Sequence, residues 1–271
     1  MPAQPGSQPA NEQYVLDNAA PETARRFAGL SAVFDPGTFR LLAERGVTAG
    51  WCCLEIGAGS GTVAAWLGER VGPAGHVLAT DIDPRFAAEL RRPNIEVRRH
   101  DITVDPLPES TFDLVHARLV LIHLPARDAT LGRIVAALKP GGWLLIEDFD
   151  LWAINADAGF DPEEGVLKSR EAMFRVMESK GVDPRCGRRM AAKMRACGLA
   201  EIGAEARLFR WQGGSPGVGI EWANLQQMRA SILASGLVTE AEFEADLARM
   251  DDPQFAYPSP VMWATWGRRP S

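Results

Sequence analysis

Apolar residues along the middle of the chain follow two spacings that alternate with each other. Short apolar runs that end at Gly, Pro or Asp predict strands, and longer segments with an apolar residue every three or four positions predict helices. The predicted strands are 52–56, 77–80, 95–98, 114–117 and 143–147, and the helices among them are 62–71, 84–90 and 126–138. This alternation is typical of an α/β fold in which helices cover both faces of a parallel sheet.

The flanking segments add further helices and two more strands. Residues 22–34 and 36–45 predict two opening helices, with Pro36 in the first turn of the second. Thr239 and Glu242 form a capping-box pattern at the start of a late helix. The other elements predicted after residue 150 are helices at 162–180, 188–196 and 221–234, a Gly-rich loop at 213–219, and strands at 204–211 and 261–266. We therefore expect a doubly wound, mostly parallel sheet of seven strands.

Composition and charge exclude several classes of protein. The 271 residues carry 29 Lys and Arg against 35 Asp and Glu, a formal net charge of -6, without a concentrated basic segment, so nucleic acid is not an expected partner. No apolar stretch reaches the roughly 18 to 20 residues that span a bilayer, so no membrane placement is expected. The first residues lack a signal-peptide pattern, and the four cysteines show no metal or disulfide spacing, which fits a reduced cytoplasm.

The segment Glu55-x-Gly57-x-Gly59-x-Gly61 carries the strongest chemical signal. It stands where a strand ends and a helix begins, so its glycines let the backbone approach a ligand and the helix start offers free N–H groups. A nucleotide-like cofactor is expected there. A dinucleotide fingerprint would place its third glycine at position 62, which is Thr62, so the spacing disfavours NAD.

Three acidic residues lie in, at the end of, or just after predicted strands, at one edge of the sheet. Glu55 lies in the first strand, Asp81 ends the second, and Asp101 follows the third. Asp81 suits the two ribose hydroxyls of a nucleoside, but NAD enzymes use an acid in the same way. Glu55 discriminates better, because its negative charge opposes a pyrophosphate and suits the ammonium and sulfonium groups of S-adenosylmethionine (SAM).

The sequence resembles the class I SAM-dependent methyltransferases, with a Rossmann-like fold. The resemblance rests on the Glu55 to Gly61 segment together with Thr80-Asp81-Ile82-Asp83, His100-Asp101-Ile102, Phe112-Asp113-Leu114-Val115 and Leu138-Lys139-Pro140-Gly141-Gly142. It implies SAM as methyl donor and S-adenosylhomocysteine (SAH) as product. It also implies site roles: Gly57, Gly59 and Gly61 hold the methionine part, Asp81 the ribose, Ile82 an adenine face, Asp101 and Ile102 the adenine edge, while Ala117 and Arg118 border the methionine end.

The flanks resemble, more loosely, small-molecule methyltransferases of secondary metabolism, in which added segments cover the substrate. We expect a single domain over residues 1–271. Its parts are a disordered tail at 1–11, a helical cap at 12–48, a SAM-binding core at 49–150, and the remainder of the sheet at 151–271 with a helical lid near 213–257. The sequence leaves the oligomeric state open, with a homodimer as one alternative.

Methyl transfer from a sulfonium needs a well-placed acceptor more than a catalytic triad. His123, after the fourth strand, is the candidate general base or substrate contact. Tyr14, Glu147 and Asp148 are the other candidate catalytic residues, the tyrosine because an N-terminal segment can cover the sulfonium and the acids because they end the fifth strand. Trp152, Trp211 and Trp222 are candidate walls for a flat acceptor.

We therefore expect an enzyme that methylates a small, apolar or aromatic acceptor without a metal. The alternatives are a nucleotide-linked oxidoreductase on a related sheet and a SAM-binding regulator without turnover. No Asn-Pro-Pro-Tyr-like motif follows the fourth strand, which disfavours a base or amide nitrogen in a polymer as acceptor. The identity of the acceptor and the choice among O-, N- and C-methylation are left open by the residues.

Overall fold

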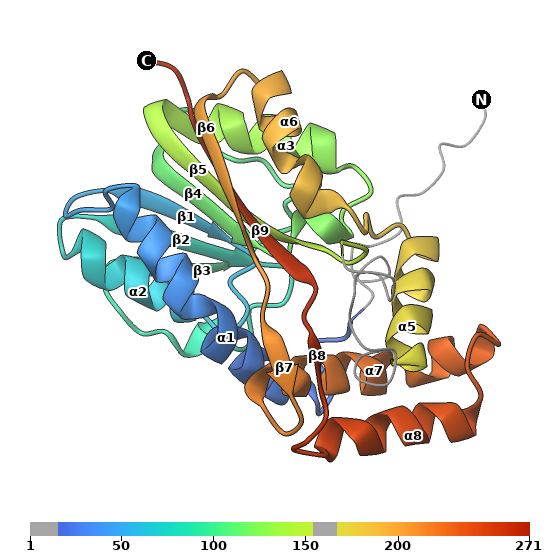
Figure 1. Ribbon diagram of the computed structural model, residues 1–271. Helices are drawn as coiled ribbons and strands as arrows, with labels where there is room; N and C mark the ends of the chain where they lie inside the picture. The colour runs from blue at the N-terminus through green and yellow to red at the C-terminus, as the bar shows by residue number, and fades with distance from the viewer. Residues whose placement is uncertain (1–15, 154–166) are drawn as a thin grey trace, which may run out of the picture.

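A single seven-stranded sheet organises the computed structural model, which describes residues 16–153 and 167–271 (Figure 1). The strand order is β3-β2-β1-β4-β5-β9-β6, with β1 to β5 parallel and β9 antiparallel to both of its neighbours. The strands are β1 Cys52–Ile56, β2 His76–Asp81, β3 Ile95–Arg99, β4 Phe112–Arg118, β5 Leu138–Asp150, β6 Ala200–Arg207 and β9 Val261–Arg268. The predicted α/β fold, with a mostly parallel seven-stranded sheet, is confirmed.

Helices cover both faces of the sheet, because successive side chains of each strand point to opposite faces. Cys53 packs in a cluster with Leu67 of α2, whereas the next residue, Leu54, packs in a cluster with Ile134 of α3. Both faces are thus apolar, as the continuous apolar strands predict. The helices are α1 Thr23–Glu44, α2 Thr62–Val71, α3 Arg127–Ala137, α5 Lys168–Ser179, α6 Cys186–Ala196, α7 Pro216–Ala234 and α8 Glu240–Asp251. None of the helices in the described residues is long and apolar enough to cross a membrane.

The two predicted opening helices are one helix, and the prediction of a break at Pro36 was wrong. α1 runs from Thr23 to Glu44 with Pro36 inside it. The proline removes one backbone donor from the helix. The neighbouring residues Phe34, Asp35 and Thr38 are buried, so their packing holds the helix continuous across the proline. The predicted helix 84–90 shrinks to the single 3₁₀ turn η2, Ala87–Glu89, because the segment is too short to add α-helical turns.

The second half of the chain departs further from the predicted elements. The predicted strand 204–211 is divided between β6 and a short strand β7, Arg210–Gln212, which pairs with β8, Ala256–Pro258, outside the main sheet. The predicted Gly-rich loop is largely helix, because Ser215 caps α7 and Pro216 occupies its first turn. The capping box of Thr239 and Glu242 is confirmed at α8. The predicted tail 1–11 and residues 162–166 of the predicted helix 162–180 lie outside the described residues.

Helix α1 lies along one face of the sheet, and its N-terminal part packs on α7, which in turn packs on α5 (Figure 1). α1 and α7 pack closely at Gly29, where an added Cβ would lie 2.6 Å from the Pro216 carbonyl oxygen. Further along, Gln227 of α7 donates a hydrogen bond to Thr23 Oγ1 of α1 at 3.0 Å. These contacts tie the first helix of the described chain to a helix almost 200 residues later and place both beside the site described next.

Candidate functional site

One cavity lies at the carboxyl edge of the parallel strands and continues under the helices α1, α5 and α7. It brings together nine of the residues predicted to bind the cofactor or to act in catalysis. These are Glu55, Gly57, Gly59, Asp81, Ile82, Asp101, Ile102, Arg118 and His123. Gly61 and Ala117 are not among its lining residues. Gly61 is the N-cap residue of α2, and Ala117 is fully buried in β4.

The glycine loop has a backbone conformation that favours glycine at each marked position. Gly57, Gly59 and Gly61 have φ angles of 70°, 51° and 80°. A Cβ added at Gly57 would lie 2.4 Å from Val120 Cγ2, and one at Gly59 would lie 3.2 Å from Phe27 Cε1. Both neighbours line the cavity. The absence of side chains at Gly57 and Gly59 therefore leaves space for a ligand beside the loop.

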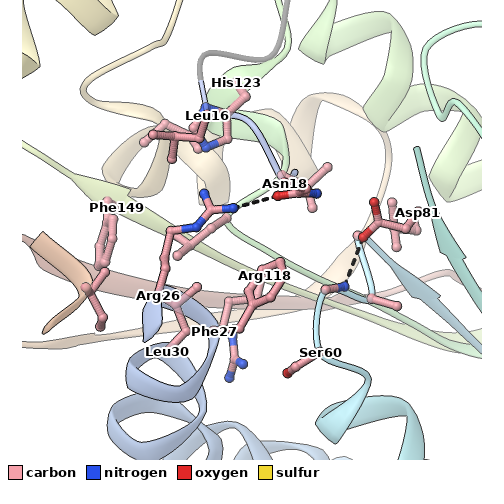
Figure 2. Close-up of a pocket in the computed structure, with 18 of the residues that line it drawn as sticks. Leu16, Asn18, Arg26, Phe27, Leu30, Ser60, Asp81, Arg118, His123 and Phe149 are labelled. Atoms are coloured by element: carbon pink, nitrogen blue, oxygen red, sulfur yellow. Dashed lines mark hydrogen bonds between the residues drawn. The ribbon is translucent and has the colours of Figure 1, made fainter. Parts of the chain in front are cut away.

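Asp81 fixes the loop to the end of β2. Its Oδ2 accepts a hydrogen bond from Gly59 N at 2.9 Å and its Oδ1 accepts one from Asp83 N at 2.9 Å (Figure 2). Burial raises the pKa of Asp81, while the two backbone N–H groups oppose that shift. Each carboxylate oxygen keeps a second lone pair, so Asp81 can still accept hydrogen bonds from a ligand diol.

Asp101, Ile82 and Ile102 form a neighbouring part of the same wall. Asp101 Oδ1 is held by Thr103, whose backbone N and side-chain Oγ1 donate at 2.8 and 2.6 Å. Ile102 is buried, and Ile82 directly follows Asp81 at the end of β2. A carboxylate between two apolar side chains is suited to a flat heterocycle that carries an amino group.

A buried charge network lies beneath the loop, and sequence reasoning missed its centre. His116 of β4 is fully buried between Glu55 and Glu147, with Nδ1 2.7 Å from Glu55 Oε2 and Nε2 3.2 Å from Glu147 Oε2. Although burial lowers the pKa of the imidazole, the two glutamates outweigh it and raise the pKa of His116 to about 9. Burial alone would raise the pKa of Glu147, but its partners, His116 first, hold it at about 2.

The network continues from the sheet into the helix α1. Thr38 Oγ1 of α1 donates to Glu147 Oε2 at 2.5 Å, and Arg207 donates to Glu147 Oε1. Arg118 donates to Thr38 Oγ1 at 2.9 Å and to Asp35 Oδ1 at 2.8 Å. Arg118 thus lines the cavity while its guanidinium is bound to α1. The signal that could have revealed this network is the register of the strands, which places Glu55 of β1 opposite His116 of β4, with Glu147 on the neighbouring strand β5.

The helix α1 and the segment before it also contribute residues to the cavity. Figure 2 shows Arg26 of α1 extending across the cavity, where it donates a hydrogen bond to Asn18 Oδ1 at 2.6 Å. Phe27 lies against the glycine loop and packs edge-on to Phe86 at 5.1 Å between ring centroids. Leu16 closes the same side of the cavity.

His123 lies in the 3₁₀ turn η3, Leu121–His123, and lines the cavity (Figure 2). Burial, together with the positive charges of Arg26 and Arg127, lowers its pKa to about 3. The imidazole is therefore neutral at physiological pH. A neutral ring with so low a pKa suits a hydrogen-bonding contact better than proton abstraction, since a general base works best with a pKa near the working pH.

The other candidate catalytic residues lie elsewhere. Glu147 belongs to the buried network, and Asp148 lies behind the sheet, where Cys186 Sγ donates to its Oδ2 at 3.6 Å and burial raises the pKa of Asp148 to about 8. Neither residue lines the cavity. Tyr14 lies outside the described residues. Within residues 16–153 and 167–271, no group of three His, Cys, Asp or Glu side chains is placed to hold a metal ion.

The far half of the cavity is mostly apolar. Its walls come from α1, the end of β5, α5, β7 and α7, and include Leu30, Phe149, Leu151, Met173, Phe174, Met177, Trp211 and Ile220. Of the three tryptophans predicted as walls, Trp211 lines the cavity, whereas Trp152 packs on Phe174 and Trp222 lies against Arg25. Glu221 and Asn224 of α7 are the polar residues of this half that the sequence did not mark.

Comparisons with known proteins agree with this site. Residues 54–144 match the family described as Methyltransferase domain. Methyltransferase str2 of Strobilurus tenacellus is 40% identical over 147 residues, which are 53% of this chain and 51% of that protein. The ubiquinone/menaquinone biosynthesis C-methyltransferase UbiE of Pseudomonas putida is 34% identical over 112 residues, 38% of this chain and 44% of that protein. The chain thus spans about half the length of the curated relatives it matches.

A solved structure shares the fold. Phosphoethanolamine N-methyltransferase 2 of Haemonchus contortus, in complex with phosphomonomethylethanolamine and SAH, aligns with a TM-score of 0.57 at 18% identity. The alignment covers 93% of this chain and 58% of that one, so the likeness extends beyond the matched domain to the flanking helices as a likeness of fold.

Proposed function

We propose that this chain, a class I SAM-dependent methyltransferase by its domain and fold, transfers a methyl group from SAM to a small, apolar or aromatic acceptor. The observation that carries the proposal is the continuity of the cavity. One end is the polar edge formed by the glycine loop, Asp81 and Asp101, and the other is the apolar space under α5 and α7. A donor at the first end and an acceptor at the second would meet inside a single enclosure.

The residues present fit a SAM molecule. The side-chain-free loop at Gly57 and Gly59 would receive the methionine part, and Arg118 would border its carboxylate. Asp81 would accept hydrogen bonds from the ribose hydroxyls, with Ile82 on the adenine face and Asp101 and Ile102 at the adenine edge. SAM supplies an activated methyl group on a positively charged sulfur, and Glu55, paired with His116, lines that end of the cavity.

The chain itself would position the acceptor and exclude water. Leu30, Phe149 and Met177 are apolar walls of the acceptor half, and such walls favour an apolar acceptor over water. In-line displacement needs the acceptor atom held close to the methyl carbon, and positioning of this kind supplies much of the rate. The helices α1, α5 and α7 would form the lid. His123 would contact the acceptor as a neutral imidazole.

The names of the relatives support the methyl donor more firmly than the acceptor. The UbiE name describes a C-methyltransferase of quinone biosynthesis, and the Haemonchus contortus protein is an N-methyltransferase. The first of these agrees with an apolar ring as acceptor, and so does the apolar lining of the far half of the cavity. The proposal therefore concerns SAM and the size and polarity of the acceptor.

Ligand-dependent thermal stability tests the donor. SAM and SAH, each at about 100 times its Kd, should raise the Tm by roughly 5–10 °C, whereas NAD and NADP should leave it unchanged. A shift with NAD alone would instead support the oxidoreductase alternative. Transfer of labelled methyl from SAM to a panel of small apolar acceptors then tests turnover. Tight SAM binding without transfer to any acceptor would favour the regulator alternative.

A further inference from the structure

The acceptor half of the cavity contains a polar position inside its apolar walls. Glu221, in the second turn of α7, is only 2% exposed and lines the cavity. Asn224 follows three residues later on the same side of the helix and also lines the cavity. Met173 and Met177 of α5 also line the cavity. A carboxylate and an amide here oppose the apolar character of their surroundings.

Both side chains present oxygen atoms that lack a hydrogen-bond donor. Glu221 Oε1 and Asn224 Oδ1 are buried and accept no hydrogen bond from any residue that the structure describes. Arg170 Nε forms an ion pair with Glu221 Oε1 at 3.3 Å without a hydrogen bond, and Arg170 Nη1 donates to the Pro258 carbonyl at 2.8 Å. A buried acceptor without a donor is costly, so such groups call for a partner that binds there.

The surroundings of Glu221 define what that partner can be. Burial raises the pKa of Glu221, and Arg170 opposes this shift while Asp246 adds to it. Glu221 Oε1 and Asn224 Oδ1 are the two unsatisfied oxygen acceptors on this part of the cavity lining. A carboxylate or phosphate on the ligand has no donor to offer to these two oxygens. A hydroxyl or an N–H group on the ligand would donate the hydrogen bonds that these oxygens lack.

We propose that Glu221 and Asn224 bind an O–H or N–H group of the acceptor, which makes the substrate class compact apolar alcohols, phenols and N–H heterocycles or amines. The inference rests on the proposed function, because it assigns the acceptor half of the cavity. It deepens that function by naming the polar group that the acceptor carries and the two residues that select it. The apolar walls hold the body of the molecule, and the two oxygens fix its orientation relative to the glycine loop.

Pairs of probes that differ only in the hydrogen-bond donor test this inference. The pairs are 2-naphthol with 2-methoxynaphthalene, 4-propylphenol with 4-propylanisole, and indole with 1-methylindole, each titrated into the full chain saturated with SAH. We expect the donor member of at least one pair to bind ten-fold or more tightly than its methylated partner, because the methylated partner would leave the buried acceptors without a donor. Glu221→Leu should reduce this preference to less than three-fold, and Asn224→Ala should weaken it.

The controls separate the possible failures. Glu178→Gln changes an exposed glutamate of α5 and should keep the full preference. Asn224 is only half-buried, so Asn224→Ala decides the question if Glu221→Leu does not fold. Two results overturn the inference. In the first, no pair shows the preference, and this includes the case in which no probe binds. In the second, the preference survives both substitutions. SAH is titrated separately in every variant: failure of SAH to bind contradicts the proposed function, whereas normal SAH binding without donor preference contradicts only this inference.

Discussion

The two halves of the cavity are built in different ways. The polar half comes mainly from residues 55–118, at or near the carboxyl ends of the parallel strands β1 to β4 and in the glycine loop, with Phe27 of α1 against that loop. The apolar half takes residues from position 30 to position 260, contributed by separate helices and strand ends. Backbone atoms and short motifs define the first half, and side-chain packing between distant elements defines the second.

This difference indicates where each kind of specificity resides. A ligand that contacts the glycine loop and Asp81 meets groups fixed by hydrogen bonds and by sheet register. A ligand that contacts α5 and α7 meets side chains whose replacement leaves the sheet intact. Substitutions in the second half should therefore change the acceptor with little effect on SAM. The predictions below test this separation.

The largest effect is expected at the buried network that joins the halves. His116→Leu leaves Glu55 and Glu147 buried without the cation between them, which should lower the free energy of unfolding by about 3–5 kcal/mol. Denaturant unfolding measures the loss. The matched control is His76→Leu, because the His76 side chain is 45% exposed and 3.8 Å from Glu96, so its removal should change stability by less than about 0.5 kcal/mol.

The pH dependence of stability sharpens this test. The folded-state pKa of His116, about 9, lies above its ordinary value of 6.5, so its contribution is complete below pH 6.5 and is lost as the pH rises through about 9. The folded-state pKa of Glu147, about 2, lies below 4.5, so its contribution is complete above pH 4.5 and is lost as the pH falls toward 2. An alkaline loss of the same size in His116→Leu would contradict this account.

The next largest effect is expected on the donor side. Asp81→Ala removes the acceptors proposed for the ribose hydroxyls, so SAM should bind about 10- to 150-fold more weakly, the equivalent of 1.5–3 kcal/mol. Calorimetric titration with SAM measures this change. The exposed residue Glu89 provides the control, and Glu89→Gln should bind SAM normally. Unchanged affinity in folded Asp81→Ala would move the ribose contact to another residue.

A smaller and more selective effect is expected on the acceptor side. Met177→Ala shortens a side chain of the cavity wall at α5 and so enlarges the acceptor half of the cavity. It should change kcat/KM for the acceptor by roughly ten-fold, while the Kd of SAM stays within a few-fold of that of the unmodified protein. Met194→Ala makes the same truncation in the buried core away from the cavity and should change neither quantity beyond a few-fold. If Met177→Ala abolished SAM binding in folded protein and kept acceptor preference, the separation of the two halves would be wrong.

The smallest effect is expected at His123. With a pKa of about 3 the imidazole stays neutral, so His123→Ala should reduce turnover by less than about ten-fold and should leave the pH profile between pH 5 and 8 unchanged. Kinetics over that pH range provide the measurement. A fall of a hundred-fold or more with intact SAM binding would show that His123 acts as the general base.

The polar half could be predicted because local sequence determines it. Gly57 and Asp81 follow apolar strands, and parallel strands bring their carboxyl ends to one edge, so spacing alone placed them together. The helix through Pro36 could not be predicted, since the burial of Phe34 and Asp35 that sustains it depends on elements far along the chain. Glu221 was missed for the same reason: its helix became part of the cavity only by packing on α1 at Gly29.

The position of residues within strands explains the remaining differences. Glu147 and Asp148 are neighbours in β5, which continues to Asp150, and alternation sends them to opposite sides of the sheet, toward His116 and toward Cys186. The order of residues in the chain does not determine which face of β5 lies toward the ligand. His116 was overlooked because a single histidine in an apolar strand carries no pattern until its partners in β1 and β5 are aligned beside it.

The location of β9 inside the sheet affects how the chain folds as it is synthesised. β5 ends at Asp150, and the strand that pairs with its free edge begins only at Val261. β6 has no partner in the sheet until β9 has been synthesised. At about 5–20 residues per second, synthesis of the chain between the end of β6 and the end of β9 takes roughly 3–12 s. During that time the newly made chain exposes two strand edges, β5 and β6, that can pair with other chains. Slower translation between residues 207 and 261 should therefore increase aggregation of the nascent protein.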